Sequence, residues 1–485
     1  MKYIKVLIFT LLCSGVVMAQ EVKQWTLQEC IDYALENNLS VKRSALNVQS
    51  SDIDLKQAQF SRLPNLNANG SYSNSWGRSI DPTTNLFVDN QKIASSNASI
   101  NSGVTLFNGL SIQNNIKQNK FGLKASEETL EDTKNTVIFN VINFYANVMF
   151  ANELYENAKK QLESTEQQVL ITEKRVKAGA LPNASLLDLL AQKATNELNL
   201  INRENDYINS KISLKQALQL PPASGIEIVV PELDSDITPV LDVTAIEIYN
   251  IALNNQPNIK AARYNTTSAE YGIKAQRGNL FPTLSLNGGM STQYSDAADR
   301  QRFVPDGGVP QIIQNPQIGF VQGTNVPVLS IDDIEIPSGT LVDNYTFGDQ
   351  YSDNLRKFIS LSLNIPIFNG FSSRNNLQRA VIAKDQAAIT EAETKYQLWQ
   401  TIEQAYNNVQ AAAKSYNASL KQVEAREESF RVTQQRYELG AVNFTDYQIA
   451  ENDLFQAKSD LLRAKYDYIL KLKVLDFYQG KPLDF

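Results

Sequence analysis

A hydrophobic repeat of seven residues constrains this chain more than any other feature. It runs through residues 373–439, where only Lys395 interrupts a series of apolar positions spaced by seven. A sustained seven-residue period is typical of a coiled-coil seam and not of a globular helix face. Because no proline falls within the segment, we predict one continuous helix, on the order of 100 Å long at 1.5 Å per residue. The apolar positions are Val381, Ala388, Ile402, Val409, Tyr416, Val423, Phe430 and Tyr437.

The same pattern occurs earlier, over residues 111–178, and the two copies share their flanking residues. Each follows a Phe-Asn-Gly tripeptide and ends in Arg-x-x-x-Gly-Ala. The matching ends lie 261 residues apart, so we interpret the chain as an internal duplication. The shared positions are Asn108, Gly109, Arg175, Gly179 and Ala180 in the first copy, and Asn369, Gly370, Arg436, Gly440 and Ala441 in the second.

Shorter predicted helices complete each repeat. We predict a first repeat over residues 20–220, a linker over 221–242 and a second repeat over 243–485. Pro64 and Pro282 mark the junctions from helix to strand, because the residue before a proline disfavours helix. The helices are predicted at 27–37, 40–62, 111–178 and 186–220 in the first repeat, and at 244–254, 258–280, 373–439 and 444–477 in the second.

Segments of period two lie between the helices. Residues 65–76 alternate apolar side chains with asparagine and serine, which is typical of a strand with one apolar and one polar face. We predict the four strands at 65–76, 98–107, 283–294 and 358–368. A long outer loop over 296–354 carries nine acidic and two basic residues. Its Asp332, Asp333 and Glu335 suit either a cation site or a solvated acidic loop, and we favour the latter.

Residues 1–19 have the pattern of a secretory signal peptide. Lys2 and Lys5 precede an apolar run, and Val17-Met18-Ala19 supplies small residues for cleavage after Ala19. No later segment approaches 18 consecutive apolar residues, so we predict no membrane-spanning helix in the mature chain.

Composition disfavours several classes of protein. The chain has no histidine, which removes the commonest general base and metal ligand, and it has no Gly-rich phosphate loop. Its net charge of −7, without basic clusters, disfavours nucleic acid as a partner. We therefore predict no enzyme activity, no cofactor and no metal site.

Four strands are too few to close a barrel, and an open sheet edge cannot face lipid. Several chains must therefore pool their strands. One polar face per strand predicts a water-filled interior. A coiled-coil structural or adhesive protein of the cell envelope, without a pore, is the alternative.

With its duplicated helix–strand–strand–helix layout, the chain resembles the TolC family of outer-membrane efflux and secretion ducts. The resemblance rests on the paired Arg-x-x-x-Gly-Ala turns and on the run from Leu454 to Tyr468. It implies a mainly α fold, in which antiparallel coiled-coil helices form a periplasmic tunnel and a homotrimer builds a 12-stranded barrel in outer-membrane lipid. It also implies a passive duct, opened by docking to a periplasmic adaptor (membrane fusion) protein and an inner-membrane RND or ABC pump.

The resemblance also implies roles for single residues. Asp446 matches the first of two aspartates at the family's periplasmic gate, whereas the second position is Ile449. Asp188 is the nearest acid in the first repeat, where the loop is predicted to be three residues longer. Plain helix reversal at the turns and helix-dipole stabilisation of Asp446 are the alternatives. The adaptor would dock at Arg175, Gly179, Ala180, Leu181, Arg436, Gly440, Ala441 and Val442.

Overall fold

The structure is a computed structural model that describes residues 24–80, 85, 87–230, 243–298 and 301–481. The expected signal peptide 1–19 lies outside the described residues. The described residues divide into a helical unit, within 24–56, 116–273 and 379–481, and a strand unit, within 57–115 and 274–378. Both units draw on both sequence repeats, and the repeat boundaries remain a prediction.

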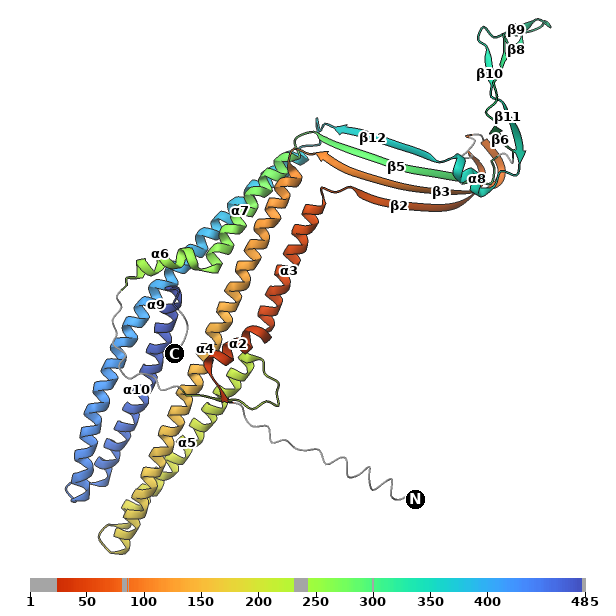
Figure 1. The fold of residues 1–485 in the computed structure, drawn as a ribbon. Helices are drawn as coiled ribbons and strands as arrows, with labels where there is room; N and C mark the ends of the chain where they lie inside the picture. The colour runs from red at the N-terminus through yellow and green to blue at the C-terminus, as the bar shows by residue number, and fades with distance from the viewer. Residues whose placement is uncertain (1–23, 81–84, 86, 231–242, 299–300, 482–485) are drawn as a thin grey trace, which may run out of the picture. The chain divides into compact units, whose positions relative to one another are not determined.

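Two helices of 67 residues dominate the helical unit: α4 (Ser111–Lys177) and α9 (Ser372–Glu438). Each is followed by a returning helix, α5 (Asn183–Leu218) after α4 and α10 (Phe444–Tyr478) after α9, and Figure 1 shows each pair side by side. The seven-residue series supplies their buried residues, such as Val137 in α4 and Ile402 in α9. The period therefore marks the packing seam, as a coiled coil requires.

Two shorter helices precede each strand pair. They are α2 (Leu27–Asn37) and α3 (Leu39–Phe60) in the first repeat, and α6 (Ala245–Asn255) and α7 (Pro257–Gly278) in the second. Thr26 and Thr244 begin α2 and α6 with capping boxes, in which each backbone N–H donates to a glutamate three residues later, at 3.0 and 2.8 Å. The second pair follows the first 218 residues later, so the repeats match at their helix starts.

Two separate hydrophobic clusters hold the helices. One cluster packs α2, α4 and α5 around Val141, Met149 and Leu214, and the other packs α6, α9 and α10 around Ile248 and Ile402. The first cluster also covers a strand pairing that was not predicted. A two-residue strand β1 (Gln24–Trp25) pairs in parallel with β4 (Glu227–Ile228), within the predicted linker.

The strand unit contains one four-stranded antiparallel sheet in the order β12–β5–β3–β2. Figure 1 shows the long strands side by side. In the isolated chain, β2 and β12 are its two edge strands. The strands are β2 (Asn65–Ile80), β3 (Phe87–Phe107), β5 (Thr283–Ser295) and β12 (Arg356–Asn364).

The register of the sheet aligns side chains of one kind across strands. Leu361, Leu286 and Val104 form one row, and the adjacent row contains Ser360, Asn287 and Gly103. Because neighbouring residues of a strand point to opposite faces, one face of the sheet is apolar and the other is polar. The apolar–polar alternation within each strand thus gives the whole sheet one apolar face and one polar face.

The predicted outer loop 296–354 is in fact structured. Residues 301–343, here called the outer hairpin, form nested antiparallel pairs: β6 (Gln301–Pro305) with β11 (Gly339–Asp343), β7 (Gln311–Ile313) with β10 (Ile334–Ile336), and β8 (Gln317–Phe320) with β9 (Pro327–Leu329). Helix α8 (Phe347–Asp353) follows. Acidic, proline-rich sequence suggested an irregular loop, but cross-strand pairing of its Ile and Val residues prevails.

Several predicted boundaries were wrong for identifiable reasons. Strands 65–76 and 98–107 extend to Ile80 and back to Phe87, because β2 and β3 continue to pair beyond the alternating stretch. Strand 358–368 stops at Asn364, where its partner β5 begins and Pro366 follows without a backbone N–H donor. Helix 40–62 ends at Phe60, and helix 186–220 runs from Asn183 to Leu218. The other helix ends differ by one or two residues.

Among the described residues, no helix combines the length and the apolar composition needed to cross a membrane.

Candidate functional site: the helical turns and the seam between the repeats

The two turns that were predicted to dock the adaptor have the same backbone geometry. Gly179 and Gly440 both have φ of 72°. The N–H of Ala180 donates to the carbonyl of Arg175, and that of Ala441 donates to the carbonyl of Arg436, each at 2.8 Å. These are Schellman caps, in which the left-handed position favours glycine. The shared motif therefore encodes the end of each long helix.

Small and apolar side chains follow both caps. Ala180 and Ala441 are exposed, and the next residues, Leu181 and Val442, are half-buried. Arg436 is exposed, whereas Arg175 is half-buried. Each turn thus presents an alanine to solvent next to a basic residue.

The helices after the turns start at equivalent positions, which corrects the prediction of a longer first loop. Helix α5 begins four residues after Gly179, and α10 begins four residues after Gly440. Pro182 and Asn183 are residues common in turns and suggested a longer loop, but Pro182 is the N-cap of α5 and Asn183 is its first residue. With equal loops, Asp188 corresponds to Ile449. Each returning helix therefore has one exposed acid in its first two turns, Asp188 in α5 and Asp446 in α10, and the two positions differ by about one helical turn.

Asp446 lies in the first turn of α10. The side chain of Asn443 caps that helix by accepting the backbone N–H of Asp446 at 2.8 Å. The carboxylate itself is exposed, as are Asp188 and Ile449. Its position suits both helix-dipole stabilisation and a role at an aqueous entrance.

A seam of polar contacts joins the two repeats near these turns, and the sequence reading missed it. Helix α4 of the first repeat donates hydrogen bonds to α10 of the second along four successive turns. The bonds are Gln168 Nε2 to Tyr447 OH at 3.2 Å, Ser164 Oγ to Glu451 Oε1 at 2.8 Å, Gln161 Nε2 to Asn452 Oδ1 at 3.3 Å and Asn157 Nδ2 to Ser459 Oγ at 3.2 Å.

The polar side chains of this seam are unusually well buried. Tyr447 is only 1% exposed and Glu451 9% exposed. Burial raises the pKa of the Glu451 carboxyl above its ordinary value, although the hydrogen bond from Ser164 opposes the shift. On the α5 side, buried Asn196 donates to Thr165 Oγ1 at 2.8 Å, and Gln448 of α10 bonds to Gln192. Side-chain hydrogen bonds thus replace apolar packing here.

A signal for the seam was present in the heptad series. The series through Phe144, Ala151 and Ala158 continues as Thr165 and Thr172, which are also buried. The change from apolar to hydroxyl side chains at seam positions marks where the coiled coil becomes polar.

The strand–helix junctions also match between the repeats. Gly109 with Leu110, and Gly370 with Phe371, form consecutive pairs with positive φ, which lets the chain turn from a strand into a long helix. Asn108 and Asn369 begin these turns by accepting the N–H of the residue three positions later. Pro64 and Pro282 stand just before β2 and β5, at the start of the sheet.

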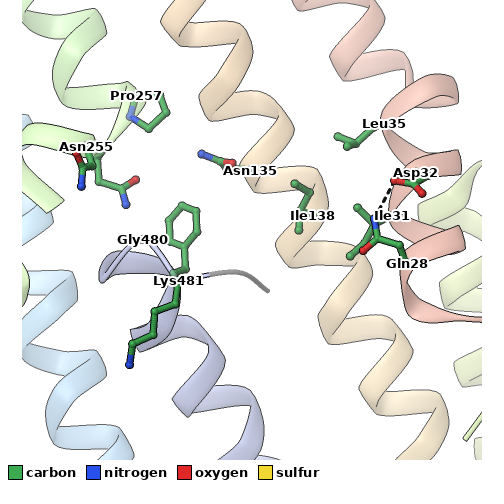
Figure 2. A pocket seen from close by; sticks show the side chains of 12 residues that line it. Gln28, Ile31, Asp32, Leu35, Asn135, Ile138, Asn255, Pro257, Gly480 and Lys481 are labelled. Atoms are coloured by element: carbon green, nitrogen blue, oxygen red, sulfur yellow. Dashed lines mark hydrogen bonds between the residues drawn. The ribbon is translucent and has the colours of Figure 1, made fainter. Parts of the chain in front are cut away.

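A cavity of about 590 Å³ lies beside α2, α4, α6 and α10 in the helical unit. Figure 2 shows Asp32 hydrogen-bonded to Gln28 on one side, at 2.9 Å, and Lys481 on another. Lys481 donates to Asp476 at 3.2 Å. The lining thus brings no nucleophile and base together. Its residues are Gln28, Ile31, Asp32, Leu35, Asn135, Ile138, Asn255, Gln256, Pro257, Phe477, Gly480 and Lys481.

The acids of the outer hairpin also form no metal centre. Within the described ranges, no group of three or more Asp, Glu or Cys side chains is placed to hold an ion. Asp332 and Asp333 are exposed, and Asp333 accepts the backbone N–H of Asn315 at 3.2 Å.

Known proteins share this sequence pattern and fold. The "Outer membrane efflux protein" family matches residues 30–219 and 248–481. The outer membrane efflux protein BepC of Brucella suis is 21% identical over 95% of this chain and 86% of its own length. An uncharacterised protein of Haemophilus influenzae is 22% identical over 63% of this chain and 62% of its own length. A crystal structure of CusC matches 94% of this chain and 92% of its own, with a TM-score of 0.73 and 18% identity. This chain therefore belongs to the outer membrane efflux protein family and has the fold of an outer-membrane efflux channel.

Proposed function

We propose that three copies of this chain form a duct through the outer membrane, the channel component of a tripartite efflux or secretion system. The observation that carries the proposal is the sheet, with one polar face, one apolar face and two open edges. Three copies supply twelve strands and pair every edge, which lipid demands. A barrel of more than about eight strands leaves space for water inside.

A contact inside the chain supplies the template for the contact between copies. Helix α4 packs against α7, where the ring of Phe121 stacks on Tyr271 at 5.5 Å between centroids and also contacts Tyr264. Ser268 Oγ donates to the carbonyl of Gln118 at 2.8 Å. This contact joins the long helix of one repeat to the short helix of the next.

The equivalent surfaces at the two ends of the chain are open. By the repeat offsets, Phe121 corresponds to Ile382 of α9, and the two tyrosines correspond to Leu46 and Ile53 of α3. Their side chains are 56%, 62% and 61% exposed, a high value for three large apolar residues. We infer that Ile382 packs between Leu46 and Ile53 of the neighbouring copy. The ring then closes through repeated use of one contact, a heterologous interface with cyclic closure.

The strand–helix junction supports the same closure. A methyl group placed on Gly109 would lie 2.4 Å from the carbonyl oxygen of Gly278, so the chain there is tightly packed. A methyl group on Gly370 would meet no atom within 4 Å among the described residues. The residues equivalent to Gly278 and Phe281 are Phe60 and Leu63, which are largely exposed. In the proposed ring, Phe60 and Leu63 of the next copy cover Gly370.

The helical turns complete the proposal. The Arg175–Leu181 and Arg436–Val442 turns offer an exposed alanine and a nearby arginine at the end of each coiled coil, and we assign docking of a periplasmic adaptor to them. An inner-membrane RND or ABC pump would supply energy through that adaptor. Asp446, with Asp188 in the other repeat, would line the entrance as rings of acids, and docking would open it.

The experiment that tests this function replaces Ile382 with aspartate. The buried charge should prevent closure of the ring, so the native mass of the detergent-solubilised protein should fall from about three chains to one. Conductance in planar bilayers should then be lost. Ile382→Val, which keeps the apolar contact, should retain both properties. A wild-type protein that runs as a single chain and still conducts ions would disprove the ring.

Bilayer conductance also separates the duct from a structural or adhesive protein. A coiled-coil fibre would form no conducting pore. The four paired strands favour the duct, because their apolar face is uncovered in the single chain: Leu66 is 74% exposed and Leu361 63% exposed, which suits contact with lipid.

A further inference from the structure

We propose that the outer hairpin (residues 301–343) docks onto the same hairpin of the neighbouring copies, and that the hairpins together form an apolar-centred cap over the outer mouth of the duct. The proposal rests on the ring of copies proposed above. It assigns a partner to the segment in which the two repeats differ most.

The outer hairpin has an exceptional amount of exposed apolar surface. A two-stranded ribbon has no second layer, so its large side chains remain in contact with water unless another surface covers them. Contiguous exposed apolar surface of this kind typically marks an interaction site. The most exposed of these side chains are Val309, Ile318, Phe320, Ile331 and Leu341.

Cross-strand pairs concentrate this surface. Phe303 lies opposite Leu341, and Ile313 lies opposite Ile334. Such pairs place large side chains next to each other on one face of a ribbon. Nearer the tip, Phe320 lies opposite Pro327.

The composition of the outer hairpin favours one mode of docking. It contains no lysine, the residue that most often protects an exposed edge strand, but five prolines interrupt its backbone ladder. Prolines limit the addition of a further strand, because they lack the N–H donor. Docking therefore occurs through apolar side-chain faces and not through a continued sheet.

The base of the hairpin is anchored to the sheet through helix α8. Arg302 of β6 forms ion pairs with Asp349 and Asp353 of α8, at 3.3 and 2.6 Å. Helix α8 in turn is bound to the sheet, since Gln350 exchanges two hydrogen bonds with Ser295, at 3.0 and 3.1 Å. Tyr351 OH is 2.6 Å from Ser96 Oγ of β3.

This anchorage favours a second copy as the occupant. The hairpin leaves the sheet between β5 and β12, and β12 is the edge at which the next copy joins. In the ring, the hairpins therefore rise from one rim. Tethered surfaces meet at effective concentrations on the order of millimolar, far above those of a free partner.

Charge disfavours the lipid surface as the occupant. The hairpin has five acidic residues against the single Arg302, which is already engaged by α8. Anionic lipids attract basic segments and repel acidic ones. Asp332 and Asp333 are exposed just before β10, Glu335 is exposed within β10, and together they form the hydrated outside of the cap.

The test uses single cysteines in the full-length protein with Cys13 and Cys30 replaced by alanine. Phe320→Cys lies on the apolar surface, and Asp332→Cys on the acidic turn is its matched control. Oxidation of the purified assembly should give a disulfide-linked dimer with Phe320→Cys and little with Asp332→Cys. A second variant replaces residues 306–338 with Asn-Gly, which retains the base pairs of β6 and β11. Its single-channel conductance should exceed that of the wild type, because the mouth is uncovered.

The outcomes separate this proposal from the one on which it rests. Native mass is measured for every variant. If the wild type is a single chain, the ring fails and the cap with it. If the assembly has the mass of three chains but Phe320→Cys does not cross-link and truncation leaves the conductance unchanged, the cap alone is wrong. Protection of Phe320→Cys from maleimide only in lipid vesicles, or only in intact cells, would assign a lipid or protein occupant and also overturn it.

Discussion

The two long helices have matching lengths and heptads but different neighbours. Helix α4 contacts the short helix of its own repeat, through Ser51 Oγ and Ser126 Oγ at 2.8 Å, and also α7 of the next repeat. Helix α9 contacts α7, where Thr266 Oγ1 donates to the carbonyl of Ala387 at 3.3 Å, but the surface around Ile382 on its other side is open among the described residues. The difference favours the proposed ring, in which the repeat continues in another copy.

The largest expected effect tests whether the two turns are equivalent docking sites. Replacing both Ala180 and Ala441 with glutamate should abolish export, because a charged side chain is expensive to desolvate in a docked interface. Each single variant should lose only part of the activity. The measurement is growth on compounds that kill a strain lacking this gene. Normal growth of the double variant, with trimer mass intact, would remove the docking assignment.

The next prediction tests which face of the sheet is apolar and which is polar. Leu361→Arg on the apolar face of β12 should destabilise the assembly by about 2–4 kcal/mol if the residue lies near the bilayer midplane. Ser360→Arg, its neighbour on the polar face, should fold and assemble. Heat-stability of the trimer on gels measures both. The opposite result would show that the faces have been assigned the wrong way round.

The two junction glycines give a direct test of the open surface. Gly109→Ala should cost about 1–2 kcal/mol for its left-handed conformation, plus about 1–3 kcal/mol for the clash with Gly278. In an isolated chain, Gly370→Ala should lower the free energy of unfolding only by the cost of the left-handed conformation, about 1–2 kcal/mol. In the ring, it should lower it by nearly as much as Gly109→Ala does. Chemical denaturation of both variants compares them. A mild effect of Gly370→Ala on the assembled protein would contradict the predicted cover by Phe60 and Leu63.

A smaller effect should distinguish the acids of the two repeats. Asp446→Asn should weaken the block of ionic current by a trivalent cation added from the periplasmic side, and Asp188→Asn should weaken it separately if both line the entrance. With Ile449 in place of a second acid of the second repeat, wild-type block should be incomplete. Single-channel recordings supply the comparison. Equal block in wild type and Asp446→Asn would remove that residue from the entrance.

The smallest effect concerns the polar seam. Because burial raises the folded-state pKa of Glu451, its contribution to stability is fully present below its ordinary pKa of 4.5 and is lost as pH rises through the folded-state value. Glu451→Gln should remove this pH dependence and stabilise the protein at neutral pH by about 1 kcal/mol or less, because the Ser164 hydrogen bond survives. Melting midpoints between acid and neutral pH test it. An unchanged profile would place the carboxyl in contact with water.

The sequence predicted the fold class because its strongest signals are local and periodic. The seven-residue series requires long helices, and the paired glycine turns end them at the observed residues Lys177 and Glu438. The alternation in 65–76 and 358–364 requires strands. Boundaries that depend on a distant partner, such as Phe87 and Asn364, could not be read, since pairing with β2 and β5 decides them.

What only the tertiary structure decided are the contacts between segments far apart in the chain. The alignment of Asp188 with Ile449 depended on where α5 begins, and the polar seam depended on α4 meeting α10 across the repeats. Residues 301–343 contain acids and prolines that are typical of a loop, but their strands pair in nested order and form a hairpin. The physical reason is the same in each case: periodicity reports which side of an element is buried, but only packing reports what buries it.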